Sequence, residues 1–192
     1  CPGFIHLISL VKSGTIGTIK DVEATFTKLV PETSRELSDK FSGGSMTELS
    51  SYVLLPILKI FGDNYKSLQF YSYYNQGVDL FTKGVMEYPN GTASFKVGLG
   101  VKSEGCLIIS GTKGYAYVPA PWWKTDYFEL RFEDMSQNRK YYYRFDGDGL
   151  RYELEEFISL IANYQKESYR LSQKESIEIA RIIEKFRSNQ DL

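Results

Sequence analysis

Hydrophobic side chains recur at the period of one helical face in several parts of the chain. The helical pattern covers residues 4–11, 46–61, 150–161 and 172–186. Gly14 and Gly62 follow the first two segments as helix-ending residues. Pro56 lies inside the second segment, where the missing N–H predicts a kink or a break. Ser172 and Glu175 have the spacing of a capping box and predict the start of the last helix.

Between these helices the period changes to the alternation of strands. Val22, Ala24 and Phe26 alternate with polar residues and predict a strand within 16–30. Later strand-like runs cover residues 68–74, 80–88, 93–101, 106–117, 127–132 and 140–145. Turn residues such as Asn90-Gly91 separate them and favour hairpins. The polar stretch 31–42 is expected to be a loop. Consecutive strands joined by short turns predict an antiparallel meander.

The order of elements is helix, strand, helix, many strands and two helices. This order indicates an α+β domain with one large, mostly antiparallel sheet and helices packed on one face. A length of 192 residues fits a single domain over residues 1–192. The chain contains 15 Tyr and 12 Phe, which suit strands with one packed and one contacting face. We therefore expect the other sheet face to be an interface in a homodimer or a larger oligomer.

Charge and composition exclude several classes of function. The net charge is −1, and basic and acidic residues are interleaved, so neither nucleic acid nor a membrane surface is an expected partner. No apolar run is long enough to span a bilayer. The first residues lack the basic region and cleavage site of a signal peptide. Two cysteines, Cys1 and Cys106, make no disulfide framework. We therefore expect a reducing, cytoplasmic setting.

The chain lacks the motifs of a self-sufficient active site. His6 is the only histidine and has no neighbouring ligand residues, so we interpret it as structural and expect no metal site. The sequence has no nucleophile elbow and no P-loop. The glycine-rich run 98–105 has the wrong spacing for dinucleotide binding and is followed by a strand rather than a helix. Tight nucleotide binding by this chain alone is not expected.

The best positive candidate is the start of the second helix. Gly43 and Gly44 allow a ligand to approach the backbone closely, and the free N–H groups of a helix start favour a negative group. Glu48 and Tyr52 are four residues apart and share a helix face, with Ser51 beside them. A carboxylate and a phenol in this arrangement can bind hydroxyl groups or transfer protons.

Simpler interpretations of these residues stay open. Ser45 and Glu48 also fit a capping box, which would give Glu48 a purely structural role. Trp122 and Trp123 are candidates for stacking on a sugar ring. Adjacent tryptophans are also typical of a packed strand entrance or of an interface.

The same motif resembles a family. Gly43-Gly44 followed by Glu48 and Tyr52 is similar to the C-terminal domain of the Gfo/Idh/MocA oxidoreductases, named for glucose–fructose oxidoreductase and inositol dehydrogenase. The usual pattern has Asp at the position of Glu48 and Gly at the position of Ser50. Three further segments resemble the family in the same order: 10–22, 111–118 and 147–157.

The resemblance implies a two-domain enzyme whose N-terminal Rossmann domain binds NAD or NADP. The C-terminal domain would supply the sheet, part of the substrate pocket and the oligomer contacts. Hydride would pass between nicotinamide and a hydroxyl-bearing carbon of a sugar, sugar derivative or cyclitol. Carried over by position, Glu48 is the acidic site residue, Tyr52 assists proton transfer, and Gly43 and Gly44 lie near the cofactor.

The resemblance also implies that this chain needs a second half. The catalytic lysine of the family belongs to the Rossmann domain, so the chain without that domain is expected to be inactive and to hold no cofactor. The longer side chain of Glu48 shifts its carboxylate, and catalysis tolerates misplacement poorly. A second hypothesis is a non-catalytic sheet domain that binds a protein or a carbohydrate through its aromatic residues.

Overall fold

The computed structural model of the chain describes residues 1–144, 147, 149–168 and 170–188. Its strands are β1 (Ile19–Thr27), β2 (Ser67–Asn75), β3 (Val78–Tyr88), β4 (Gly91–Gly98), β5 (Leu107–Gly111), β6 (Gly114–Val118), β7 (Tyr127–Phe132) and β8 (Arg139–Tyr142). Its helices are α1 (Pro2–Lys12), α2 (Arg35–Ser38), α3 (Ser45–Phe61), α4 (Gly149–Ala162) and α5 (Gln173–Ser188), with a 3-10 turn η1 (Met135–Gln137).

The strands form one eight-stranded sheet in the order β2-β3-β4-β1-β5-β6-β7-β8. All neighbouring pairs are antiparallel except β1 and β4, which run parallel. The predicted meander is therefore wrong in one respect, because β1 separates β4 from β5. Pairing of β1 with strands that come much later in the chain leaves no local signal in the sequence.

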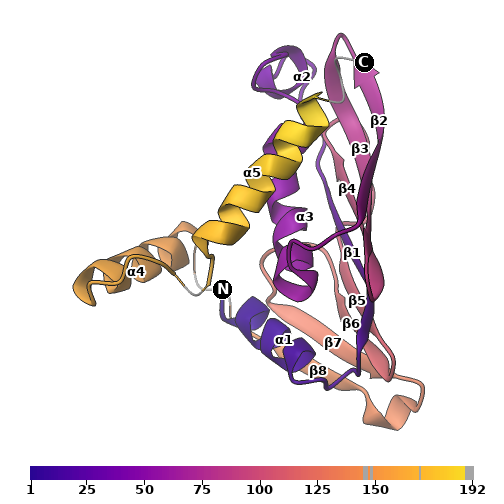
Figure 1. Ribbon diagram of the computed structural model, residues 1–192, viewed down its shortest axis with the longest axis vertical. Coiled ribbons are helices and arrows are strands. Elements are labelled where there is room, and N and C mark those ends of the chain that lie inside the picture. Colours follow the sequence, from indigo (N-terminus) through magenta and orange to yellow (C-terminus); the bar gives the residue numbers. More distant parts are fainter. Residues whose placement is uncertain (145–146, 148, 169, 189–192) are drawn as a thin grey trace.

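Three helices cover one face of this sheet, which confirms the predicted α+β class. Figure 1 shows α3 alongside the strands, with α5 outside it and α1 at the β7–β8 end. The core is filled by strand residues at every second position and by one face of α3. Val22, Phe95 and Leu107 from the sheet meet Val53 and Ile57 of α3 in one continuous cluster.

Helix α3 runs without a break through Pro56, so the predicted break does not occur. Proline removes the hydrogen bond to the carbonyl of Tyr52 but leaves the other helical bonds intact. Val53, Pro56 and Ile57 are all buried. Packing on both sides of the proline therefore holds the helix together.

Several predicted boundaries move where turns are tight. The predicted strand 106–117 is two strands, because a hairpin at 112–113 separates β5 from β6. The predicted loop 31–42 contains α2, a single turn too short to show periodicity. The predicted strand 140–145 is β8 and ends at Tyr142; Phe145 lies outside the described residues, as does Asp148 of segment 147–157.

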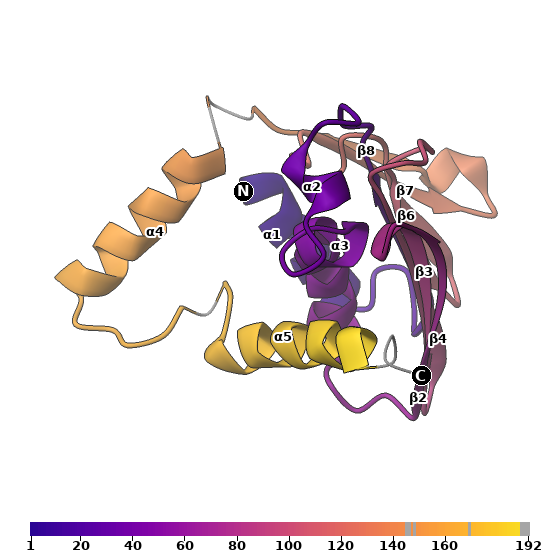
Figure 2. The ribbon, with the colours of Figure 1, turned by 90° about the horizontal axis from the view of Figure 1, so that it is seen from above.

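The two C-terminal helices differ in their contact with the domain. Seen from above in Figure 2, α5 lies beside α3, whereas α4 projects away from the body. The predicted capping box of α5 is confirmed, since Ser172 N–H donates to Glu175 and Glu175 N–H donates to Ser172 Oγ. No residue of α4 is buried.

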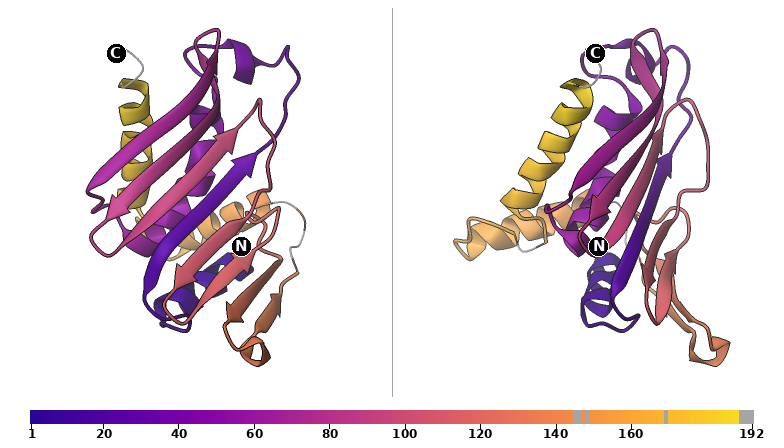
Figure 3. Two further views of the ribbon diagram at one scale, coloured as in Figure 1. Left: turned by 90° about the vertical axis from the view of Figure 1, so that its right-hand side faces the viewer. Right: turned by 45° about the vertical axis from the view of Figure 1, so that its right-hand side comes forward.

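The opposite face of the sheet carries no helix in the described part of the chain (Figure 3). Phe70 of β2 packs against Phe186 of α5, so its neighbours Tyr71 and Tyr73 point to this uncovered face. Their side chains are 58% and 59% exposed. Among the described residues, no helix is long and apolar enough to cross a membrane.

Candidate functional site

The segment Gly43–Tyr52 forms the start of α3, and its glycines are held against the rest of the domain. The N–H of Gly43 donates to the carbonyl of Asp39 at 2.7 Å, and that of Gly44 donates to Glu36 at 2.9 Å. Gly44 has a φ of +95°, and a Cβ there would lie 2.1 Å from Asp79 Oδ1. Both glycines are therefore required for close packing, and their N–H groups are engaged within the domain.

Asp79 of β3 satisfies the first turn of α3. Its Oδ2 accepts a bond from Met46 N–H at 3.0 Å and one from Thr82 Oγ1 at 2.9 Å, and Ser45 Oγ also donates to it. The N-cap residue is Gly44, so Ser45 does not cap the helix as a capping box requires. Burial raises the pKa of Asp79, and the hydrogen bonds oppose that rise.

Glu48 is thereby free for another partner, which is Arg35 of α2. Arg35 Nη2 lies 2.6 Å from Glu48 Oε1, and Arg35 Nη1 donates to Ser42 Oγ at 2.9 Å. The hydrogen bond and the charge of Glu48 raise the pKa of Arg35. The cap interpretation of Glu48 is wrong, and its carboxylate is instead oriented as the acid of an ion pair.

Tyr52 lies one turn after Glu48 and belongs to a group of aromatic side chains. Its ring meets the ring of Phe26 edge-on, with 4.9 Å between the centroids. Phe26 in turn stacks on Trp123 at 3.9 Å and an interplanar angle of 20°. We call Phe26, Tyr52 and Trp123 the aromatic wall. Tyr52 is 45% exposed, so its phenol is accessible at the edge of this wall.

The two adjacent tryptophans have different positions. Trp122 is buried, and its Nε1 donates to the carbonyl of Thr25 at 2.9 Å. Trp123 is partly buried and supplies the stacked ring of the aromatic wall. The structure therefore brings Trp123, not Trp122, against the ring that contacts Tyr52.

Two serines of α3 also have contrasting positions. Ser51, predicted beside Glu48 and Tyr52, is exposed to solvent. Ser50 is fully buried, and its Oγ has no hydrogen-bond partner among the described residues. Ser50 stands where the resemblance leads us to expect glycine.

Sequence reasoning missed three residues of this site. Arg35 lies in a polar stretch with no periodic pattern, Phe26 follows the ordinary alternation of a core strand, and Asp79 stands alone beside a turn. Each acquires its role through a tertiary contact with α3. No signal within one stretch of sequence distinguishes them from structural residues.

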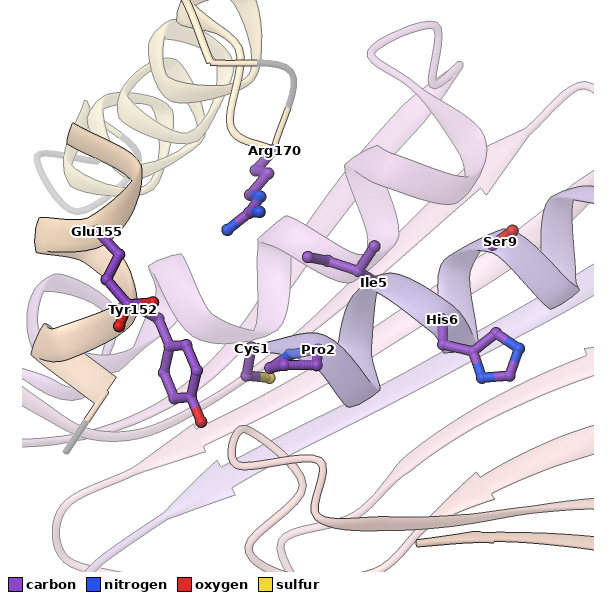
Figure 4. Close-up of a pocket in the computed structure, with 8 residues that line it drawn as sticks. All are labelled: Cys1, Pro2, Ile5, His6, Ser9, Tyr152, Glu155 and Arg170. Carbon is purple, nitrogen blue, oxygen red and sulfur yellow. The ribbon is translucent and has the colours of Figure 1, made fainter. Parts of the chain in front are cut away.

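A hollow of about 510 Å³ lies elsewhere, between α1 and α4. Figure 4 shows Tyr152 and Glu155 of α4 facing Cys1 and Pro2 across it. His6 lies at its edge, bonds Tyr143 through Nδ1 and packs its ring against Tyr141 and Phe128. This packing agrees with a structural role for His6. In the described ranges, no group of His, Cys, Asp and Glu side chains could hold a metal ion.

Comparison with known proteins gives consistent matches. The family model of the GFO/IDH/MocA C-terminal domain matches residues 4–117. Two trans-1,2-dihydrobenzene-1,2-diol dehydrogenases, from Oryctolagus cuniculus and Sus scrofa, are 27% and 26% identical to the chain. Each alignment covers 97% of this chain but only 59% and 58% of the relative.

Solved structures share the fold at lower identity. Levoglucosan dehydrogenase in complex with NADH and levoglucosan matches with a TM-score of 0.76 and 15% identity over 95% of this chain and 59% of that chain. Aldose–aldose oxidoreductase from Caulobacter crescentus matches with a TM-score of 0.77 and 14% identity over 97% of this chain and 58% of that chain. The chain thus spans little more than half the length of these proteins.

Proposed function

This chain belongs to the GFO/IDH/MocA family, and on that premise we propose that it is the C-terminal, substrate-binding domain of an NAD(P)-dependent oxidoreductase. The substrate class is a sugar, a sugar derivative or a cyclitol. The observation that carries the proposal is the placement of Glu48 and Tyr52 on one side of α3, where Tyr52 belongs to the aromatic wall and Glu48 lies one turn before it. A nucleotide-binding domain outside these 192 residues would hold the cofactor.

In this proposal Trp123 and Tyr52 contact the carbon skeleton of the substrate, and the buried Phe26 supports both rings. An aromatic face packs well against the apolar face of a ring, while hydroxyl groups at its edge need polar partners. Tyr52 supplies a phenol at that edge, and Glu48 supplies a carboxylate one helical turn away. The names of the relatives, which act on a ring diol and on an anhydro-sugar, are consistent with this class.

The proposed roles follow from the chemistry of the side chains. Bound NAD(P) would accept or supply the hydride. The Tyr52 phenol donates a proton to the substrate oxygen during reduction and accepts it during oxidation. Arg35 pairs with Glu48 and fixes the direction of its carboxylate, so that the carboxylate can accept a hydrogen bond from a substrate hydroxyl.

The test is activity of the protein expressed from its whole reading frame, assayed with NAD(P) and a panel of cyclic polyols. We expect Tyr52→Phe to lower kcat by about 100-fold or more with unchanged NADH binding, since general acid–base groups contribute roughly that much. Tyr74→Phe, which removes an exposed phenol beside α5, away from the site and from the uncovered sheet face, is the matched control and is expected to keep full activity.

Full activity of Tyr52→Phe would refute the role of Tyr52. A reading frame without a nucleotide-binding domain would refute the proposed function as a whole and favour the non-catalytic sheet module.

We also propose that the uncovered sheet face forms a homodimer or a larger oligomer. Besides the exposed tyrosines of β2, it carries Arg131, whose guanidinium lies 4.7 Å from the Tyr117 ring centre, and Tyr142, which is 73% exposed. Tyrosine and arginine are enriched at protein interfaces. Sedimentation should give a dimer or a larger species at micromolar concentration. A clean monomer would contradict the interface.

A further inference from the structure

Helix α4 carries a stripe of large apolar side chains that its own domain leaves exposed. The members, which we call the α4 stripe, recur at the period of one helix face and are between 50% and 63% exposed: Leu150, Leu154, Phe157, Ile158 and Ile161. The helix has no buried residue at all. In a globular domain, an apolar helix face of this size normally packs against the core.

The orientation of α4 is the reverse of that expected for a helix that belongs to this core. Its polar side faces the domain, because Tyr152 and Glu155 line the hollow beside Cys1 and Pro2 (Figure 4). Tyr152 lies about 200° around the helix from Leu150 at 100° per residue, on the side opposite the stripe. The stripe therefore points away from its own sheet and helices.

Either a separate protein molecule or another domain of the same polypeptide could cover the stripe. The contact area that each one needs distinguishes the two. The stripe spans about 20 Å of helix at 1.5 Å per residue, one side chain wide. Two separate molecules need about 800 Å² on each partner for a stable complex, which a single helix stripe does not supply. A domain of the same polypeptide needs less area, because tethering raises its effective concentration into the millimolar range.

The relatives are much longer than this chain. Their alignments include nearly all of this chain, yet it spans 59% of the rabbit relative and 56% of UDP-N-acetylglucosamine 3-dehydrogenase from Acidithiobacillus ferrooxidans. Cys1 lies beside α4, at the hollow that Tyr152 and Glu155 line. A domain joined ahead of Cys1 would therefore start next to this helix.

We infer that the α4 stripe is the docking surface for the nucleotide-binding domain of the same polypeptide. This inference rests on the proposed function, which assigns such a domain to the protein. Docking would cover the stripe and hold α4 between the two domains.

Amide hydrogen exchange of peptides covering residues 150–164 tests the inference. In the protein from the whole reading frame, we expect exchange at least about tenfold slower than in the 192-residue chain, because docking suppresses local opening. Ile161→Glu in the longer protein places a charge in the stripe and should abolish this protection. Ser159→Glu, on the opposite side of α4, is the matched control and should keep it.

NADH binding, measured in the same samples by fluorescence, separates the two proposals. A longer protein that binds NADH but leaves α4 unprotected overturns the docking surface and leaves the proposed function intact. Protection of α4 without NADH binding supports docking and counts against the proposed function. Concentration-dependent protection in the 192-residue chain would assign the stripe to a second copy and overturn the inference.

Discussion

Helices α4 and α5 end the same chain, and the more charged of the two is the one that packs. In α5, Ile182 is fully buried and Phe186 is 3% exposed. In α4, Phe157 and Ile161 are both 61% exposed although they belong to a comparable apolar face. A helical pattern thus predicts that a partner exists, but the shape and charges of the available surfaces decide where it is.

Helix α5 matches the surface that α3 and β2 offer. The Phe186 ring meets Phe70 at 5.1 Å, and Lys59 of α3 bonds Glu175 at 2.9 Å. The Tyr65 hydroxyl donates to Glu178 at 3.1 Å. Apolar and polar contacts together therefore hold α5 against α3 and β2. The side chains of the α4 stripe, by contrast, are at least half exposed.

The largest expected effect is a loss in the free energy of unfolding when a buried side chain of α5 is truncated. Ile182→Ala should lower it by about 3 kcal/mol, since a buried isoleucine loses its apolar contacts and leaves a cavity. Ile161→Ala in the α4 stripe is the matched change and should cost less than about 1 kcal/mol in the 192-residue chain. Urea denaturation followed by circular dichroism measures both.

Equal losses for the two alanine variants would contradict the difference in packing between α4 and α5, because they would place the α4 stripe in a packed environment. In the longer protein, we expect the Ile161→Ala loss to increase if the stripe is covered there.

A smaller effect is expected at the ion pair between α5 and α3. Glu175→Gln should lower the free energy of unfolding by about 2 kcal/mol, because Lys59, only 11% exposed, loses its charged partner. Lys59→Met should recover part of this loss in the double variant. No recovery in the double-mutant cycle would show that the two side chains do not act together.

The same pair predicts a dependence on pH. Burial by itself would raise the pKa of Glu175, but the hydrogen bond from Ser172 and the charge of Lys59 lower it below the ordinary value of 4.5. A carboxyl whose pKa is lower in the folded state stabilises the fold above its unfolded pKa and loses that contribution as the pH falls through the folded pKa. The difference between wild type and Glu175→Gln should therefore shrink below pH 4.5. A difference that is constant down to pH 2 would contradict this role.

The smallest effect is expected on α4. Arg151 and Glu155 form an ion pair at 2.9 Å, with side chains 59% and 56% exposed. Glu155→Gln should change the free energy of unfolding by no more than about 0.5 kcal/mol, because solvent screens an exposed pair. A loss comparable to that of Glu175→Gln would mean that α4 is held against the domain.

The sequence predicted the elements well where the period is long and regular. The predicted strand 127–132 has the bounds of β7, and the apolar positions of 46–61 are the buried face of α3. The position of β1 and the single turn of α2 were missed. The position of β1 depends on pairing with strands far away in the sequence. Helix α2 is too short to show a helical period.

The candidate site was predicted only in part, for a related reason. Glu48 and Tyr52 are detectable because one helix carries both at a fixed spacing. Arg35 and Phe26 come from other elements and meet them only after folding. The resemblance to a family supplied the functional interpretation, whereas the residue pattern alone did not choose between a site and a cap.

The central place of β1 also sets an order of assembly during synthesis. Asp21 of β1 accepts a hydrogen bond from Thr92 of β4, 71 residues later in the chain. At 5–20 residues per second, about 4–14 s of translation separate these two residues. Until then both edges of β1 lack their native neighbours, and an unpaired strand is a template for wrong pairing. Nascent chains of this domain should therefore depend most on chaperones in the interval after β1 has been synthesised and before β4 has been synthesised.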